Sequence, residues 1–271
     1  MADVCNALAL YFRLLALSVR AQMQYRVSFL LMAISQFVVN GVEAVGVWAL
    51  FTRFGSLVPW TLPQVALFYG VVNVAFAFTD AFARGFDLFG NQLVKTGNFD
   101  RLLLRPRSTV LQVAGQELTL FRVGRMLQGL VVMIWAITAL DIDWTLWRVL
   151  LLVFALKATF ALFYGLVIVQ ATLSFWTTES LEIMNTVTYG GVETAQYPLA
   201  IYQRDFRRFF TFIVPLGCVT YFPLVAVLGV DDPLGTSFVF QICAPLAGFV
   251  FLAAALLLWR IGVRQYTSTG S

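Results

Sequence analysis

The apolar stretch WRVLLLVFALKATFALFYGLVIVQATLS, residues 147–174, contains only two charged side chains, Arg148 and Lys157. A helix needs about 20 mostly apolar residues to cross the hydrocarbon core of a bilayer, and this stretch is longer than that. The sequence therefore predicts a membrane-spanning helix here, with Lys157 well inside it.

Further apolar runs extend this pattern along a chain of 271 residues. The chain is 60% hydrophobic and 12% charged, whereas soluble domains carry about a quarter charged residues. A transmembrane barrel would show alternating segments of ~10 residues, and none is visible. We therefore predict an all-α polytopic membrane protein of six spans, four of the others at about 27–52, 63–83, 126–140 and 237–259, with the remaining one within residues 175–236.

Several residue types and motifs are missing, and their absence narrows the function. The chain has no histidine, which removes His-based catalytic sites, HExxH zinc sites and haem ligation by histidine. Cys5, Cys218 and Cys243 are widely spaced and form no metal or redox motif. No G-x-x-x-x-G-K-[ST] loop is present to bind a nucleotide. We expect no catalytic residue, no metal and no cofactor in this chain.

The net charge of +4 is explained better by membrane topology than by binding to nucleic acid. Lys and Arg collect in the cytoplasmic loops next to membrane spans. If the number of spans is even, the basic N-terminal piece, the basic region 85–125 and Arg260 with Arg264 all lie on one side. We therefore expect both termini in the cytoplasm.

Residues 4–24 carry a polar stripe that differs from the later spans. Asn6, Arg13, Arg20 and Gln24 recur at about seven-residue spacing, which places them on one side of a helix. This pattern favours a helix that lies in the membrane interface with its polar side toward water. The alternative is the start of a long first span.

Residues 175–236 allow two arrangements. In the first, 178–199 is the fifth span, and 200–236 is an outer region with short re-entrant helices. In the second, 178–208 is cytoplasmic and 209–229 is the fifth span. The basic residues near 204–208 favour the second. The frequent prolines favour the first, because irregular backbone at membrane depth is tolerated where protein or water covers it.

The stretch GNFDRLLLRPRST, residues 97–109, lies between the second and third predicted spans. Asp100 can begin a short helix, since an acid is favourable near the positive end of the helix dipole. Pro106 stops the helix, because the residue before a proline disfavours helical geometry. The leucines need a cover in the cytoplasm. Either a groove on a partner, a contact within the chain or the surface of anionic lipid could supply it.

The longer phrase GNFDRLLLRPRSTVLQVAGQELTLFRVGR resembles the signature of type-2 ABC exporter permeases. It is closest to a small six-span subgroup whose central loop reads G-x-[FL]-D-x-x-L-x-[RK]-P. Two later phrases, SFWTTESLEIMNTVTYGGVETAQYPLAIY and TFIVPLGCVTYFPLVAVLG, are similar to the ending of that subgroup. The resemblance covers essentially the whole chain. It implies one permease domain over residues 1–271, with the first of the two arrangements for 200–236.

The resemblance also implies a mechanism and partners. A second permease, related or identical, pairs with this one, and two copies of an ABC ATPase subunit hold ATP and Mg. The pair exports an amphipathic or lipid-like substrate across the bacterial plasma (inner) membrane. A short cytoplasmic helix couples the subunits: Leu102, Leu103 and Leu104 fill a cleft of the ATPase. The coupling segment comprises Asn98, Phe99, Asp100, Arg101, Leu102, Leu103, Leu104, Arg105 and Pro106.

Polar residues inside the spans suggest a substrate path. A charge at the centre of a span costs roughly 2.5–3.5 kcal/mol on insertion scales, and Lys157 is the deepest, so we expect it to be paired. The alternatives are ion pairs between helices and close helix packing. The residues of this possible path or gate are Asn73, Asp80, Lys157, Glu182, Asn185 and Tyr189.

Two other functions remain open from the residues alone. A secondary transporter would often show repeats in matching halves, and we see none. An intramembrane enzyme would need carboxylates at catalytic spacing, for which Glu179 and Glu182 are the only close pair. Either would work without an ATPase.

Overall fold

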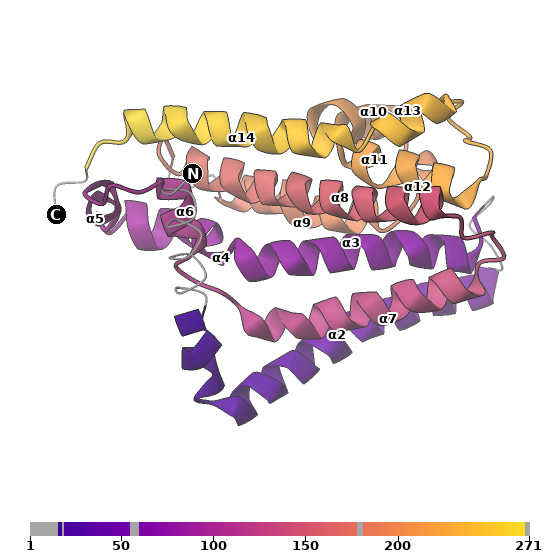
Figure 1. Ribbon diagram of the computed structural model, residues 1–271, viewed down its shortest axis with the longest axis horizontal. Coiled ribbons are helices and arrows are strands. Elements are labelled where there is room, and N and C mark those ends of the chain that lie inside the picture. The colour runs from indigo at the N-terminus through magenta and orange to yellow at the C-terminus, as the bar shows by residue number, and fades with distance from the viewer. Residues whose placement is uncertain (1–15, 18, 55–59, 178–180, 269–271) are drawn as a thin grey trace.

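The computed structural model describes residues 16–17, 19–54, 60–177 and 181–268, without the side chains of residues 181–183. Every element of secondary structure in this part of the chain is a helix. Within it, the helices long and apolar enough to cross a membrane are α2 (Arg26–Phe54), α3 (Leu62–Phe82), α7 (Val123–Ala139) together with the short turn before it from Leu120, α8 (Leu146–Leu173) and α14 (Leu246–Gln265) (Figure 1). The prediction of an all-α polytopic membrane protein is confirmed.

The predicted limits of the first four spans agree with α2, α3, α7 and α8 to within a few residues. The last predicted span, 237–259, differs, because a short α13 (Phe238–Cys243) precedes α14 and α14 continues to Gln265. Of the predicted interfacial helix 4–24, residues 1–15 and 18 lie outside the described part. Residues 19–23 are helical, and a turn at 24–25 separates them from α2.

Residues 181–228 form α9 (Leu181–Ala195), η3 (Leu199–Ile201), α10 (Arg204–Arg208), η4 (Phe209–Ile213), α11 (Leu216–Val219) and α12 (Tyr221–Leu228). The segments 204–213 and 216–228 meet at a bend of 73°. Both ends of this pair lie at the same end of the bundle (Figure 1). The Tyr202 hydroxyl donates to Thr194 O at 3.2 Å near the end of α9, and Gly229 lies against Arg148 at the start of α8. The bent pair is a broken span or a re-entrant loop, and α9, with 15 residues, is shorter than the helices that are long enough to cross a membrane.

The bent pair reaches the middle of the bundle. The Thr159 hydroxyl, halfway along α8, donates to Val219 O at 3.2 Å. The ring of Tyr221 then packs against Trp60, before α3, with the centroids 6.1 Å apart. The backbone carbonyl groups at the bend are thus covered by protein, as irregular backbone in a bilayer requires.

Helix α3 is the centre of the bundle and is buried along most of its length. It packs against α7 on one side and α8 on the other, and α14 packs against α8 (Figure 1). Glycines allow these close approaches: a side chain at Gly248 would overlap the carbonyl group of Ala158, and one at Gly124 would overlap that of Ala33. Small residues at helix contacts are typical of membrane bundles.

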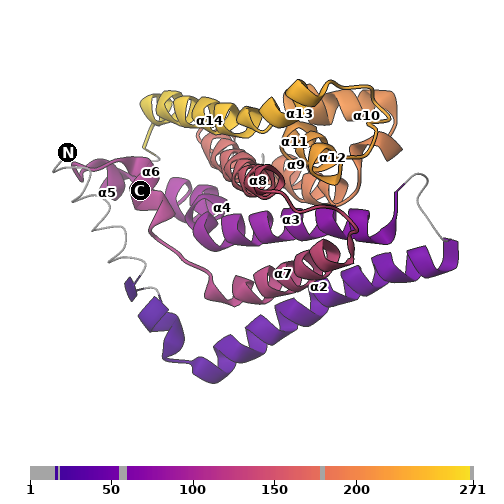
Figure 2. The same cartoon turned by 45° about the vertical axis from the view of Figure 1, so that its right-hand side comes forward.

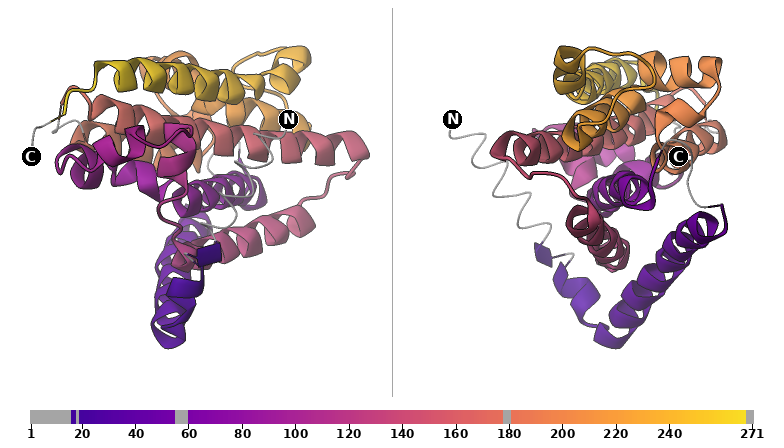
Figure 3. Two further views of the ribbon diagram at one scale, coloured as in Figure 1. Left: turned by 60° about the vertical axis from the view of Figure 1, so that its left-hand side comes forward. Right: turned by 90° about the vertical axis from the view of Figure 1, so that its right-hand side faces the viewer.

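Helix α2 leans away from the other helices and contacts mainly α7 (Figures 2 and 3). Many of its large apolar side chains are exposed, among them Leu31, Val38 and Trp48. In a bilayer these side chains face lipid or a second membrane protein. The structure therefore leaves an apolar surface at the side of the bundle.

The loop between α12 and α13 is organised around Asp232. Its carboxylate accepts hydrogen bonds from the Tyr221 hydroxyl at 2.7 Å and from the Leu234 backbone N–H at 2.9 Å, and from both the hydroxyl and the backbone N–H of Thr236. Partial burial raises the pKa of Asp232, but the hydrogen bonds together lower it more, so that it lies below its usual value.

A lowered carboxyl pKa makes this loop sensitive to acid. Its contribution to stability is complete above the unfolded pKa of about 3.9 and is lost as the pH falls through the lower folded value. We expect Asp232→Asn to lower the unfolding temperature near neutral pH, and the difference from the parent to shrink towards about pH 3. Thermal unfolding in detergent at a series of pH values measures this. An equal difference at every pH would contradict the assignment.

Candidate functional site

The segment between α3 and α7 folds into short helices at one end of the bundle, the left end of Figure 1. They are α4 (Arg84–Asp87), η1 (Gly90–Val94), α5 (Phe99–Leu103), α6 (Thr109–Ala114) and η2 (Leu120–Arg122). Gly97 has φ +68°, in the left-handed region that glycine adopts without strain. This turn directs the chain into α5, which lies in the predicted coupling segment.

Helix α5 has a buried side and an exposed side. Phe99 is 0% exposed and Leu102 is 6% exposed, whereas Leu103 is 42% and Leu104 is 85% exposed. The expectation that Leu102 fills a cleft on a partner is therefore corrected: Leu102 packs inside its own chain, because α5 turns that side toward the bundle. Leu103 and Leu104 remain available to a partner.

Phe99 is part of an aromatic cluster that connects α5 to several helices. Its ring centroid lies 5.1 Å from that of Phe89, 5.5 Å from Phe175, 5.0 Å from Tyr266 and 6.4 Å from Trp259. Aromatic pairs at these separations stabilise the fold by more than the burial of their apolar surface alone. Phe175 follows α8 and Trp259 belongs to α14, so a movement of α5 reaches both of these long helices.

Hydrogen bonds fix the rest of the predicted coupling segment. Gln112 Nε2 donates to Leu102 O and to Arg107 O, each at 3.1 Å, and thereby closes the loop after α5. Asn98 Nδ2 donates to Thr96 Oγ1 at 2.8 Å. Asp100 accepts a hydrogen bond from the Ser268 hydroxyl at 2.6 Å.

The exposed charges of this loop are Arg101, Arg105 and Arg107, which lie next to the two exposed leucines. Helix α5 ends at Leu103, three residues before Pro106, so the proline lies in the exposed turn beyond the helix and does not form its end. The result is a rigid projection with an apolar tip and a basic rim.

A second group of functional candidates lies inside the bundle, where α3 meets the beginning of α7. Asp80 Oδ2 lies 2.9 Å from Arg122 Nε, and the side chains are only 7% and 19% exposed. The pair joins the end of α3 to the η2 turn. A buried pair of this kind stabilises only when both partners are present.

Arg125 extends this network deeper into the bundle. Its Nε donates to Asn73 Oδ1 at 2.9 Å, and its guanidinium lies 4.8 Å from the centroid of the Phe76 ring. Asn73 Nδ2 donates to Tyr69 O at 3.0 Å, and the Tyr69 hydroxyl donates to Asn40 O on α2 at 2.9 Å. The network thus links α2, α3 and α7 through polar contacts.

Two more of the predicted path residues lie beside this network, on α9. The ring centroid of Tyr189 is 5.6 Å from that of Phe76. Gln170 Nε2 on α8 donates both to Asn185 Oδ1 at 3.3 Å and to Asp87 Oδ1 at 3.2 Å. The structure therefore brings together Asn73, Asp80, Asn185 and Tyr189 around α3.

Lys157 does not join this group. It is exposed on the side of α8 that also exposes Leu150 and Val153, and it forms no ion pair in the part of the chain that the structure describes. The expected partner is thus not found among the described residues, and Lys157 does not face the polar group around α3. Its position in the apolar run did not reveal which side of α8 faces the bundle. The side chain of Glu182 lies outside the described residues.

Arg122 and Arg125 are the functional candidates that the sequence analysis missed. Both counted there as cytoplasmic charges, whereas the structure buries them against α3. One signal could have found them: Asn73 and Asp80 are seven residues apart on α3, and Arg122 and Arg125 are three apart at the start of α7. Such spacings place two polar groups on one side of each helix.

The fold and these sites define a polytopic helical membrane protein with a charged interhelical network and a rigid projection at one end. Residues 37–270 match the family described as ABC-2 family transporter protein, and the chain belongs to that family. This family is a membrane transport component of ABC transporters, is not itself a nucleotide-binding domain and associates in general with an ABC ATPase subunit. No curated protein and no solved structure matches the chain.

Proposed function

We propose that this protein is the permease subunit of an ATP-driven exporter and that residues 98–106 couple it to a separate ATPase subunit. The observation that carries the proposal is the two-sided α5. Its Phe99 and Leu102 are buried in the aromatic cluster, while Leu103 and Leu104 are exposed beside three arginines. An apolar tip on a rigid support is the form that a coupling element needs.

In this proposal the transporter holds two permeases and two ATPase subunits, and the ATP and Mg belong to the ATPase subunits. ATP-driven closure of those subunits moves α5, and the aromatic cluster transmits the movement to α8 and α14. Rigid-body movement of this kind is a common form of switching. The substrate is an amphipathic or lipid-like compound, the permeases lie in a bacterial plasma membrane, and the termini are cytoplasmic.

Purification of the tagged chain from its native membrane tests the proposal. We expect a P-loop ATPase to accompany it, with or without a second permease, and the ratio of chains gives the stoichiometry. Reconstituted vesicles should then transport substrate with ATP and without a proton gradient. A chain that purifies alone, or transport driven by a proton gradient without ATP, would overturn the proposal in favour of a secondary transporter.

A further inference from the structure

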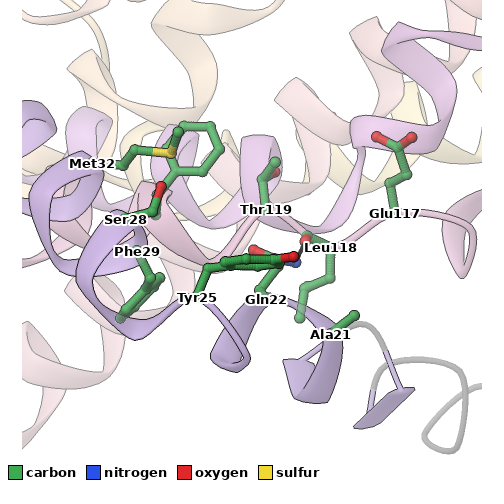
Figure 4. Close-up of a pocket in the computed structure, with 10 residues that line it drawn as sticks. Ala21, Gln22, Tyr25, Ser28, Phe29, Met32, Glu117, Leu118 and Thr119 are labelled. Carbon is green, nitrogen blue, oxygen red and sulfur yellow. Dashed lines mark hydrogen bonds between the residues drawn. The ribbon is translucent and has the colours of Figure 1, made fainter.

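A cavity of about 450 Å³ opens between the start of α2 and the segment that leads into α7 (Figure 4). Its walls include the aromatic rings of Tyr25, Phe29 and Phe121 and the thioether of Met32, and Glu117 lies at its edge. Among the described residues, no lysine or arginine lines it. Sites for small organic molecules commonly have 300–1,000 Å³, mostly apolar walls and a few polar groups.

The cavity is held in shape by hydrogen bonds between distant parts of the chain. Gln22 accepts from the Leu120 N–H at 3.0 Å. It also donates to Leu118 O, and both of these residues are labelled in Figure 4. Thr119 in turn donates from its backbone N–H to Ala81 O at 3.2 Å and from its hydroxyl to Asp80 O at 3.0 Å. The far wall is thus anchored to the end of α3, so the cavity is a built feature of the fold.

The chemistry of the lining favours a positively charged ligand. Glu117 forms no ion pair in the described part of the chain, so its negative charge is available to a ligand. The faces of aromatic rings attract cations, and Met32 fits varied apolar shapes. Tyr25, in the turn before α2, and Met32 on α2 are also exposed, next to the apolar surface that meets the bilayer. A ligand with an apolar body and a cationic group suits this combination.

The same side of α2 carries a second carboxylate deeper in the span. On α2, Met32, Gln36 and Glu43 are separated by four and seven residues, so they lie along one side of the helix. Glu43 is exposed. A charged acid within a span has an unfavourable free energy of insertion, so its presence suggests a functional role. Such an acid needs a counterion.

Glu43 forms no ion pair within 4.0 Å in the described part of the chain. Its charge interacts with those of Glu193 on α9 and Arg125 on α7. Neither acid has an ion pair with a described lysine or arginine, and Arg125 is held by Asn73 and by the Phe76 ring. Two carboxylates on different helices thus leave a negative region that a cation could occupy.

We propose that this cavity binds an amphipathic organic cation. In the cavity, the carboxylate of Glu117 faces the cationic group of the ligand. Deeper in the membrane, the carboxylates of Glu43 and Glu193 bind the same cationic group. The proposal names the substrate class for the permease proposed above. Binding itself requires neither ATP nor the ATPase subunit, so it can be tested separately from the transport function.

The test uses the purified full-length chain in nanodiscs of phosphatidylcholine and two probes of matched shape and opposite charge. Tetraphenylphosphonium is the cation and tetraphenylborate is the anion, and empty nanodiscs give the background of each. We expect saturable binding of the cation alone. Glu117→Gln and Glu43→Gln should each weaken it about tenfold or more. Lys157→Gln and Asp205→Asn, which change exposed charges elsewhere, should leave it unchanged.

Equal saturable binding of the anion, or parent-like binding of the cation in both glutamine variants, would overturn the proposal. If cation binding is weakened in Glu117→Gln but not in Glu43→Gln, the cavity is the binding site and Glu43 does not contribute to binding. Equal unfolding temperatures of parent and variants establish that a loss reflects the site. If the cation binds but no ATPase accompanies the chain, the binding site stands and the exporter proposal fails.

Discussion

The double variant Leu103→Asp/Leu104→Asp is expected to lose ATP-driven transport while its helices stay folded. The two side chains are 42% and 85% exposed, and surface substitutions usually change stability by less than about 0.5 kcal/mol. In a cleft of the ATPase, however, two buried aspartates would replace two apolar contacts. Loss of a central apolar contact costs about 2 kcal/mol or more of binding, or roughly 30-fold in affinity.

The measurement compares the amount of ATPase that purifies with each variant and the ATP-driven transport of reconstituted vesicles. Leu111→Asp is the matched control, because Leu111 is 37% exposed on the neighbouring α6 but lies outside the coupling segment. Leu103→Met/Leu104→Met keeps the apolar surface and should keep transport. Normal co-purification and normal transport by the aspartate variant would disprove the coupling role of α5.

The choice of variant shows what the structure adds to the sequence. The run of three leucines alone suggests one apolar surface that includes Leu102. In the structure Leu102 is 6% exposed and packs in the same core as Phe99. An aspartate at Leu102 would disrupt that core and would not report on the partner. The buried and exposed sides of a helix this short depend on the aromatic residues that gather from α8 and α14, and these are distant in the sequence.

The long spans were predictable because each helix is long and apolar enough to cross a bilayer without contacts to other helices. About 20 apolar residues make a span whatever its neighbours are, and α2, α3, α7 and α8 agree with this rule. The region after residue 175 was harder, since α9 to α12 are short and rely on contacts with α3 and α8. Two arrangements are compatible with the sequence, and the bent pair at 204–228 is a broken span or a re-entrant loop.

The polar network around α3 shows the same limit of prediction from the sequence. Asn73 and Asp80 were identified as functional candidates because polar groups are rare in spans, and the structure brings them together with Arg125 and Arg122. Their partners looked like ordinary cytoplasmic charges, because the positive-inside rule concerns composition and not side-chain direction. Lys157 shows the opposite error: its depth in the span was correctly recognised, but only the packing of α8 revealed that it faces outward.

The buried pair of Asp80 and Arg122 provides the second large expected effect. Asp80→Asn should destabilise the protein by about 3–5 kcal/mol, because removal of one partner leaves the other as an uncompensated buried charge. The double variant Asp80→Asn/Arg122→Gln should recover part of this loss, since it removes the unpaired guanidinium too. Denaturant unfolding in detergent of the parent, both single variants and the double variant gives the coupling free energy.

Asp205→Asn is the matched control, because Asp205 is 96% exposed and lies 3.9 Å from Arg208; exposed pairs contribute little, so no measurable change is expected. A loss in the double variant equal to the sum of the two single losses would show that the pair itself contributes nothing. The pair of Asp80 and Arg122 also lies next to the cavity, so its loss should affect ligand binding. Thr119, which bonds to Asp80 O, and Arg122 belong to the same short segment, and that segment also forms the wall of the 450 Å³ cavity. A weakened pair should therefore loosen the cavity together with the contact between α3 and α7, and Asp80→Asn should bind the cationic probe less well than Asp205→Asn does.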